Sequence, residues 1–459
     1  MRSFTGPSSG RLFCCILKGY PCLWMRIKMI KRLVSLAWPL FLAQLAVTGM
    51  AVTDTIVAGW AGTHELAVVA VGANLLLLGI MFVYGVLLIL SPQVAEMRIT
   101  QPDFLPVLLQ QGMIVGVGAG VLACLIIIVM LKIVPFFVNE VLLVGITQYL
   151  LFGLPALILA GVYFALRLFW EGLHFTHWTA FVSILLFLVN IPLDWFFVIE
   201  MNLGGAGCAL ATLVSFIIAI VISFILFKQK AELRPMLDRL YPLKLHRSVL
   251  TRMVRLGLPA SLALLSEVSL FMLLALLIAP FGVVALAGHQ IAINITSVLY
   301  ILPFSLSLAL AIEVGRLQGQ GNRQALVRLM KRGMVLSLVV GMGLSILTYL
   351  LHERLPMAFT HDDAVRQMAS TLLLFAAAYQ VADALQMGSA GILRGLGDTR
   401  WIMGVTLISY WVVGIPLGAW LAWSMAWQAA GYWVGVVVAL TLAGVLLAMR
   451  VRTQAHRLT

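Results

Sequence analysis

Twelve apolar segments, each long enough to cross a lipid bilayer, restrict the possible folds of this chain more than any other feature. A membrane-spanning helix needs about 20 predominantly apolar residues. Windows bounded by charge, glycine or proline give the predicted spans 33–59, 66–92, 107–133, 141–166, 179–199, 206–227, 253–279, 285–314, 332–351, 367–393, 402–424 and 430–449. The composition agrees, because 62% of the residues are hydrophobic and only 10% are charged. Soluble domains have roughly 45–50% apolar and about 25% charged residues, so the bilayer must be the solvent of this chain.

The basic residues predict the orientation of the spans. All lysines and arginines except Lys132, Arg354 and Arg366 fall in the N-terminal arm, the even-numbered loops or the C-terminal tail. Cytoplasmic loops are enriched in these residues, so we expect a multi-pass protein of the cell (inner) membrane with both termini in the cytoplasm. The enrichment of lysine and arginine in the predicted cytoplasmic segments accounts for the net charge of +13. The loops hold no basic patch interleaved with aromatic residues, and we therefore expect no nucleic-acid partner.

The two halves of the sequence resemble each other, which predicts an internal duplication. Residues 36–74 align with residues 256–294, and this shift places Pro39 on Pro259. Further coincidences of glycine, asparagine and tryptophan follow at nearly the same offset. Six spans in each half is an even number, so both halves enter the membrane from the same side. Such halves are related by an axis along the membrane normal and face each other across a central cavity.

We therefore predict an all-α integral membrane protein with twelve transmembrane helices in two pseudo-symmetric six-helix bundles. Residues 1–28 form an N-terminal extension, for which we expect either disorder or a true translation start at Met25 or Met29. Mass spectrometry of the intact N-terminus tests that expectation. The other predicted parts are an N-terminal bundle over 29–227, a basic cytoplasmic linker over 228–252, a C-terminal bundle over 253–450 and a cytoplasmic tail over 451–459.

Three carboxylates, Glu267, Asp383 and Asp54, lie inside predicted spans. An ionised acid at the centre of a membrane helix costs roughly 2.5–3.5 kcal/mol on insertion scales, and it usually marks an ion or proton pathway. Tyr379 lies four residues before Asp383 on the same helix face, where its hydroxyl can donate to the carboxylate or bind a cation. These four residues are the candidate cation-coupling group. If the ion is Na⁺, its ligands come from Glu267, Asp383 and Tyr379. The alternative role is a structural hydrogen bond to a neighbouring helix.

Other polar residues within the spans are candidates for lining a substrate cavity. Asn190 and Asp194 bracket Pro192, whose ring frees a backbone carbonyl that nearby polar groups can satisfy. Gln290 and Asn294 lie one helical turn apart in a later span. We predict that these four residues contact the substrate.

The sequence lacks the motifs of enzymes and of zinc sites. It contains no HExxH, GxSxG or GxxxxGK[ST] pattern, so we expect neither enzymatic activity nor a cofactor. None of the five cysteines has CxxC or Cys/His spacing. Cys124 and Cys208 fall in apolar spans, where we expect them to be small core residues.

Several motifs, taken in order, resemble the multidrug and toxic compound extrusion (MATE) transporters, in particular the NorM-like branch. The resemblance covers about residues 29–450. The matching stretches are Leu36–Pro39, Asp54-Thr55, Asn190–Trp195, Gly204–Cys208, Glu267-Val268, His289-Gln290 with Asn294, Tyr379-Gln380, Asp383-Ala384 with Gln386, Leu393–Gly395 and Tyr410-Trp411.

The resemblance implies two six-helix bundles around a V-shaped cavity, and exchange of inward Na⁺ or H⁺ for outward cationic, amphipathic drugs. It also implies that Glu267, Tyr379 and Asp383 form the cation site of the C-terminal bundle. Asp54 and Asn190 are similar to polar members of the N-terminal bundle. One departure is Asp194, because some relatives have a neutral amide there.

The prediction is a secondary active multidrug efflux antiporter that works by alternating access, as a monomer in the bilayer, with Na⁺ or H⁺ as coupling ion. The alternative of a lipid-intermediate flippase requires cationic side chains for phosphate headgroups, whereas the predicted spans contain acids. An intramembrane enzyme would need a nucleophile and base at one depth. A passive channel would carry currents far above the turnover of a transporter. The choice between Na⁺ and H⁺ stays open because both use the same carboxylates.

Overall fold

The computed structural model describes residues 21–136, 139–231, 233–234, 236 and 244–458, and all regular elements in these ranges are helical. Among the described residues, twelve continuous helical segments are long and apolar enough to cross a membrane, and each contains one of the predicted spans. Two of these segments comprise two α-helices each. The all-α membrane fold predicted from the apolar windows is therefore confirmed. Its helices begin and end as follows: α2 (Pro21–Ala61), α3 (Thr63–Leu87), α4 (Leu90–Thr100), α5 (Leu105–Leu131), α6 (Glu140–Gly172), α7 (Thr176–Asp194), α8 (Gly205–Gln229), α10 (Arg247–Ile278), α11 (Val283–Gly319), α12 (Arg323–Leu351), α13 (Asp363–Gly395), α14 (Thr399–Leu407), α15 (Ile415–Ser424) and α16 (Gln428–Leu458).

Two spans contain wider, π-helical turns. The segment η3 (Trp195–Glu200) continues α7, and η6 (Ile408–Gly414) joins α14 to α15. Such turns are rare and occur frequently at functional sites. Short 3-10 turns occupy the loops: η1 (Pro102–Phe104), η2 (Val134–Phe136), η4 (Ala279–Phe281) and η5 (Leu355–Ala358).

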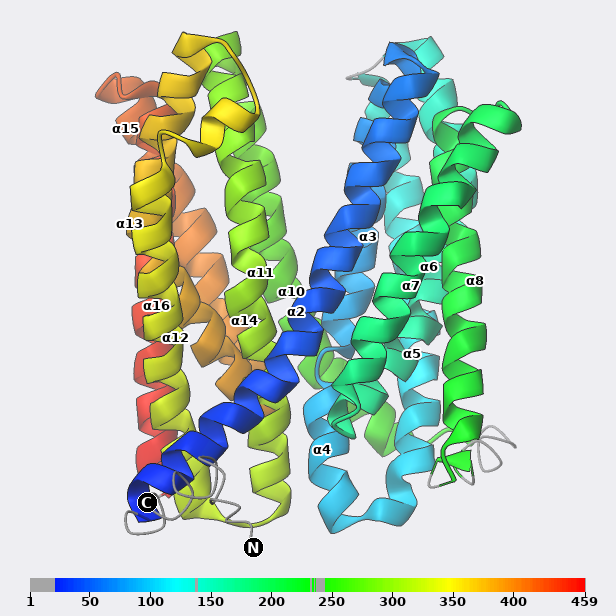
Figure 1. The fold of residues 1–459 in the computed structure, drawn as a ribbon, viewed down its shortest axis with the longest axis vertical. Coiled ribbons are helices and arrows are strands. Elements are labelled where there is room, and N and C mark those ends of the chain that lie inside the picture. The colour runs from blue at the N-terminus through cyan, green and yellow to red at the C-terminus, as the bar shows by residue number, and fades with distance from the viewer. Residues whose placement is uncertain (1–20, 137–138, 232, 235, 237–243, 459) are drawn as a thin grey trace, which may run out of the picture.

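The helices form two bundles, one from α2–α8 and one from α10–α16 (Figure 1). Each bundle packs around its own hydrophobic core. The helix α2 connects them, because Leu33 near its start packs in the core of the second bundle and Leu40 packs in the core of the first. The bundles lie close at the end of the molecule where α2 begins and α16 ends, and their helices diverge toward the opposite end (Figure 1).

Several helices extend beyond the apolar windows. α2 begins at Pro21, inside the predicted N-terminal extension, and α10 begins at Arg247, inside the predicted linker. α16 continues through the predicted tail to Leu458. The windows stop at charged residues, but a helix continues into the headgroup region, where water can solvate such side chains. Residues 1–20 of the extension and residues 232, 235 and 237–243 of the linker lie outside the described residues.

Small residues allow the two bundles to touch. A Cβ atom added to Gly257 of α10 would lie 2.1 Å from the carbonyl oxygen of Val86 in α3. On the same pair of helices, a Cβ on Gly85 would lie 2.6 Å from the Cα of Ser261, whose hydroxyl donates to the carbonyl of Phe82 at 2.9 Å. Close backbone approach at small residues is the usual way in which membrane helices associate.

A group of charged side chains joins the bundles at their closed end. Glu313 of α11 is 2% exposed and lies 3.2 Å from Arg32 of α2 and 3.7 Å from His174, in the turn between α6 and α7. Arg316, one turn along the same helix, pairs with Glu313 at 2.6 Å. Contacts from Glu313 therefore reach two elements of the other half of the chain.

Candidate functional site

In the second bundle, Glu267 of α10 lies between helices, 6% exposed. Glu267 lies roughly 16 Å along the helix axis from Ile278, where α10 ends. This distance is close to half of the ~30 Å hydrocarbon thickness, so the carboxylate lies near the middle of the span. The Nε2 atom of Gln386 on α13 donates to Glu267 Oε2 at 3.5 Å and also contacts the hydroxyl of Tyr410. Tyr410 belongs to the π-helical η6, so Gln386 connects side chains from three membrane spans at this site.

Asp383 lies three residues before Gln386 on α13 and is 7% exposed. The two side chains share a helix face, which places Asp383 one turn from the amide that contacts Glu267. Tyr379 lies one further turn away, 4% exposed, and its ring stacks on Trp433 at a centroid distance of 6.3 Å. The structure thus places Glu267, Asp383 and Tyr379 on α10 and α13 of one bundle, and their role in binding a cation stays a prediction.

A cavity of about 30 Å³ opens beside Glu267. Tyr300, Gln386 and Arg394 line it together with the carboxylate. The volume suits one or two water molecules, and these side chains supply the polar partners that a buried water needs. Arg394 is buried, its Nη2 lies 3.5 Å from Ser307 Oγ, and its Nη1 has no hydrogen-bond partner among the described residues. The cavity therefore lies between a buried carboxyl group and a buried guanidinium group.

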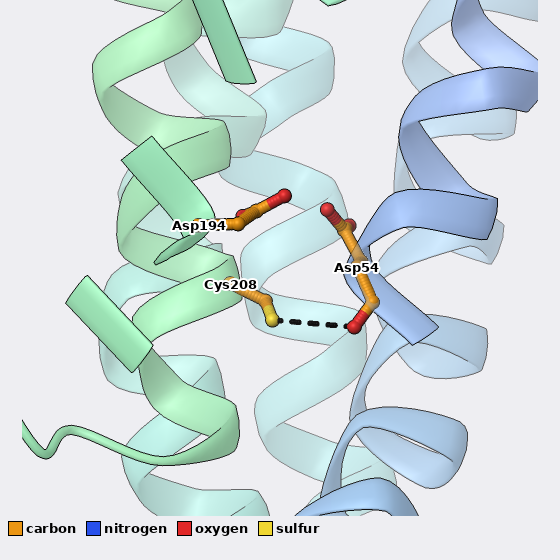
Figure 2. Close-up of side chains that lie close together, drawn as sticks. All are labelled: Asp54, Asp194 and Cys208. Atoms are coloured by element: carbon orange, nitrogen blue, oxygen red, sulfur yellow. Dashed lines mark hydrogen bonds between the residues drawn. The ribbon is translucent and has the colours of Figure 1, made fainter. Parts of the chain in front are cut away.

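The first bundle holds a second acidic cluster, built by α2, α7 and α8 (Figure 2). The side chains of Asp54 and Asp194 point toward each other, and the thiol of Cys208 lies beside them (Figure 2). One ligand atom from each residue lies within 4.8 Å of the others. The Sγ of Cys208 donates to the backbone carbonyl of Asp54 at 3.6 Å. Asp194 ends α7, directly before the π-helical turn η3.

Asn190 and Asp194 are both 0% exposed, so in this conformation they lie inside the first bundle and not on the wall of an open cavity. Asn190 Nδ2 lies 3.5 Å from Asp194 Oδ1, which joins both predicted substrate residues to the Asp54 cluster. The reason is the helical spacing of four residues, which places both side chains on the face of α7 that packs on α2.

Gln290 and Asn294 are exposed, and Ser297 continues the same face of α11. Exposed polar side chains at positions i, i+4 and i+7 form a stripe that is unfavourable in contact with lipid. The stripe therefore fits a water-filled surface, and the role of Gln290 and Asn294 in lining a substrate cavity stays a prediction.

Some residues of these clusters have no role in the sequence-based prediction. Cys208 was expected to be only a small core residue; it is 0% exposed but also touches the acid pair. Gln386, Tyr410 and Arg394 occur in the motifs that resemble the MATE family, without an assigned role. The position of Gln386 one turn after Asp383 was a usable signal, whereas no spacing in the sequence links Tyr410 to Glu267.

Known proteins show the same architecture and related sequences. The MatE family model matches residues 39–196 and 259–420, one segment in each half. The two matches begin at Pro39 and Pro259, the prolines that the internal alignment superposes. The duplication predicted from the sequence is therefore confirmed, since one model describes both halves.

The sequence relatives are bacterial. The chain is 34% identical over 446 residues to a probable multidrug resistance protein NorM of Acinetobacter baylyi, covering 94% of this chain and 97% of that protein. It is 34% identical over 443 residues to the multidrug resistance protein MdtK of Pectobacterium atrosepticum, covering 92% and 95%.

Solved structures share the fold at low sequence identity. The crystal structure of the eukaryotic MATE transporter AtDTX14 matches with a TM-score of 0.83 at 19% identity, covering 94% of this chain and 99% of that one. The outward-facing structure of a multidrug resistance MATE transporter matches with a TM-score of 0.83 at 18% identity, covering 93% and 96%. From the family model, the relatives and the shared two-bundle fold, we conclude that this chain belongs to the MATE family of transporters.

Proposed function

We propose that this chain is a secondary active antiporter of the inner membrane, which exports cationic, amphipathic compounds in exchange for Na⁺ or H⁺. The sequence relatives named as multidrug resistance proteins support the substrate class. In this proposal the closed end of the bundles faces the cytoplasm, as the positive-inside rule predicts. The conformation described above is then open toward the outside.

The environment of Glu267 carries the proposal. This carboxyl group lies at mid-span, is contacted by the neutral amide of Gln386, and is buried. Among the residues that the structure describes, no ion pair includes Glu267 or Asp383. An ionised carboxylate in such a place costs several kcal/mol unless a cation neutralises it. Arg394 lines the same cavity, but within the described residues its hydrogen bond goes to Ser307 and it forms no ion pair with Glu267. A bound proton or Na⁺ therefore supplies the neutralisation, and its release changes the energy of the second bundle.

Coupling follows if the cation and the drug favour different conformations. A ligand shifts a conformational equilibrium only by the difference between its affinities for the two states. Cation binding at Glu267 and Asp383 favours the state in which these acids are buried and neutralised, whereas the drug occupies the space between the bundles. The exposed amides Gln290 and Asn294 are the polar groups that we assign to that space. The ion gradient then drives drug export through this difference.

Transport in proteoliposomes tests the proposal. The protein is reconstituted and ethidium export is measured under a Na⁺ gradient alone and then under a pH gradient alone. We expect one of the two gradients to drive transport. Glu267→Gln and Asp383→Asn should each abolish gradient-driven export while the protein remains folded, because the neutral amides cannot bind and release the cation.

Two exposed acids provide matched controls. Glu353 is 77% exposed and Asp363 is 94% exposed at their side chains, both outside the cavity. Glu353→Gln and Asp363→Asn make the same chemical changes and should retain export. Full export by the Glu267 and Asp383 variants would show that the proposed coupling site is wrong.

A flippase for lipid-linked intermediates is not favoured, because a phosphate headgroup needs cationic side chains along its path. Arg394 is basic and within a span, but it is buried inside the second bundle beside Glu267. The acids and amides described above instead match cationic substrates.

A further inference from the structure

The cluster of Asp54, Asp194 and Cys208 combines two carboxylates with a sulfur atom deep inside the first bundle. Figure 2 shows the two carboxylates facing each other, with Cys208 on the side of the pair. Two carboxylates this close cannot both stay ionised without a proton or cation between them. Asp54 Oδ1 and Asp194 Oδ2 are buried and have no hydrogen-bond partner among the described residues. These carboxylate oxygens are therefore available as ligands for a bound proton or metal cation.

Asn190 supplies a separate observation. Its side chain is 0% exposed, its Nδ2 contacts Asp194, and its Oδ1 has no hydrogen-bond partner within the described part of the chain. A buried amide oxygen without a partner is destabilising, and a bound cation would relieve this. The site then offers four donor atoms from α2, α7 and α8: three oxygens and one sulfur.

The donor set distinguishes between cations. Na⁺ and other hard ions bind oxygen, whereas thiolate selects softer metals such as Zn²⁺ and related ions. Tetrahedral Zn²⁺ sites place Cys sulfur at about 2.3 Å and carboxylate oxygen at about 2.0–2.2 Å from the metal. The ligand atoms of the three residues lie within 4.8 Å of one another, so one metal ion between them can be approached by all three side chains. In the second bundle, Met387 lines the cavity beside Glu267 and its sulfur accepts from the Tyr300 hydroxyl at 3.5 Å. That sulfur belongs to an uncharged thioether and cannot supply a thiolate ligand.

The charges also balance. With one proton shared by the two aspartates, the cluster without metal carries a single negative charge. A divalent metal replaces the proton shared by the two aspartates, and the Cys208 thiol releases its proton as it becomes a ligand. Three negative ligands and one divalent metal again carry a single negative charge, so binding releases two protons and adds no net charge to the buried site.

We propose that Asp54, Asp194 and Cys208, with Asn190 as the fourth donor, form a site for a soft divalent cation, with Cd²⁺ and Zn²⁺ as the representative ions. Occupation of this site blocks the acid pair, so such ions inhibit transport. The inhibition rests on the proposed antiport function with Asp54 in the coupling group, whereas the binding itself does not.

Cadmium titration of the purified, detergent-solubilised protein tests the binding. The three cysteines before residue 29 are replaced by serine, which leaves Cys124 and Cys208. Cd²⁺ addition should produce one equivalent of the ultraviolet thiolate-to-cadmium charge-transfer band. Cys208→Ser should abolish the band, and Asp194→Asn should weaken Cd²⁺ affinity at least tenfold.

Cys124→Ser is the matched control, because this thiol lies in α5 and donates to the carbonyl of Leu154, away from the acids. It should leave the band unchanged. Equal cadmium binding by the wild type and Cys208→Ser would overturn the site. Thermal melting of each variant checks that it is folded, and Cys208→Ala repeats the test with a different side chain if the serine variant is unstable.

Ethidium export by proteoliposomes tests the inhibition. Each rate is divided by the cadmium-free rate of the same variant, so the test does not require that Cys208→Ser transports at the wild-type rate. Micromolar Cd²⁺ should reduce export by the wild type at least tenfold and reduce export by Cys208→Ser less than twofold. A charge-transfer band without loss of export would overturn the competition with the acid pair. Cadmium binding in a protein that shows no ion-driven export would instead overturn the antiport function and leave the metal site standing.

Discussion

The charged contacts around Glu313 predict how a single substitution shifts the conformation. Arg316 lies on the same helix as Glu313, so their ion pair persists in both conformations. It therefore contributes nothing to the free-energy difference between them. Only the contacts of Glu313 with Arg32 and His174 are lost when the closed end separates. Glu313→Gln keeps the size of the side chain and removes its charge.

The magnitude follows from distance and exposure. At an effective dielectric constant of 20, two charges 4 Å apart interact by about 4 kcal/mol. The side chain of Arg32 is 43% exposed, and solvent screening reduces such a pair to about 1 kcal/mol. His174, 3.7 Å away, adds at most a similar amount when it is protonated. Losing about 1–2 kcal/mol of interaction with Arg32 and His174 should favour separation of the bundles at their closed end. The population of molecules separated there should increase about 5- to 30-fold.

Double electron–electron resonance measures this population. Spin labels at Thr100 of α4 and Arg323 of α12, both exposed, report on the separation of the two bundles near the closed end. We expect Glu313→Gln to increase the long-distance component. Asp398→Asn is the matched control, because Asp398 pairs with Arg450 at 2.7 Å within the second bundle. An unchanged distance distribution, or an equal change in the control, would refute the role of Glu313 in closing the bundles.

Three further predictions concern packing and the cation site. Arg167→Met should lower the free energy of unfolding by about 3–5 kcal/mol, because it removes the arginine that pairs with the fully buried Glu171 at 2.9 Å. Thermal melting of the solubilised protein measures this loss, and a variant as stable as the wild type would contradict it. Gly257→Val should hinder closure of the bundles, since a Cβ at this position would lie 2.1 Å from the Val86 carbonyl oxygen; cross-bundle spin-label distances that stay as short as in the wild type would argue against this. Tyr410→Phe removes the hydroxyl beside the buried glutamine of α13 and should change the apparent affinity for the coupling cation about 3- to 30-fold, corresponding to about 0.6–2 kcal/mol; an unchanged cation dependence of ethidium export would remove Tyr410 from the site.

Much of the fold follows from the sequence, because membrane spans are long and continuously apolar. Each predicted window lies within one membrane-spanning helical segment, and the alignment of Pro39 with Pro259 identifies the duplication. The apolar windows do not show which helix face is inside, because lipid-facing and core-facing residues are equally apolar. For this reason the burial of Asn190 could not be predicted.

The candidate site was predictable only in part. Carboxylates within apolar segments are visible in any sequence, and Asp383 with Tyr379 follows from helical spacing. Contacts between segments that are far apart in the chain produce no recognisable spacing in the sequence. Cys208 lies 154 residues from Asp54, and Tyr410 lies 24 residues from Gln386 across a π-helical segment that the apolar pattern does not show.

The exchange of a drug for a cation through the buried acids is the central claim, and reversed coupling tests it most directly. Proteoliposomes are loaded with ethidium at equal Na⁺ concentration and pH on both sides, and the movement of Na⁺ and H⁺ is followed as ethidium leaves. We expect one of these ions to move inward as ethidium leaves, and we expect Asp383→Asn to abolish this movement. Ethidium efflux through the wild-type protein without any opposite cation movement would contradict it.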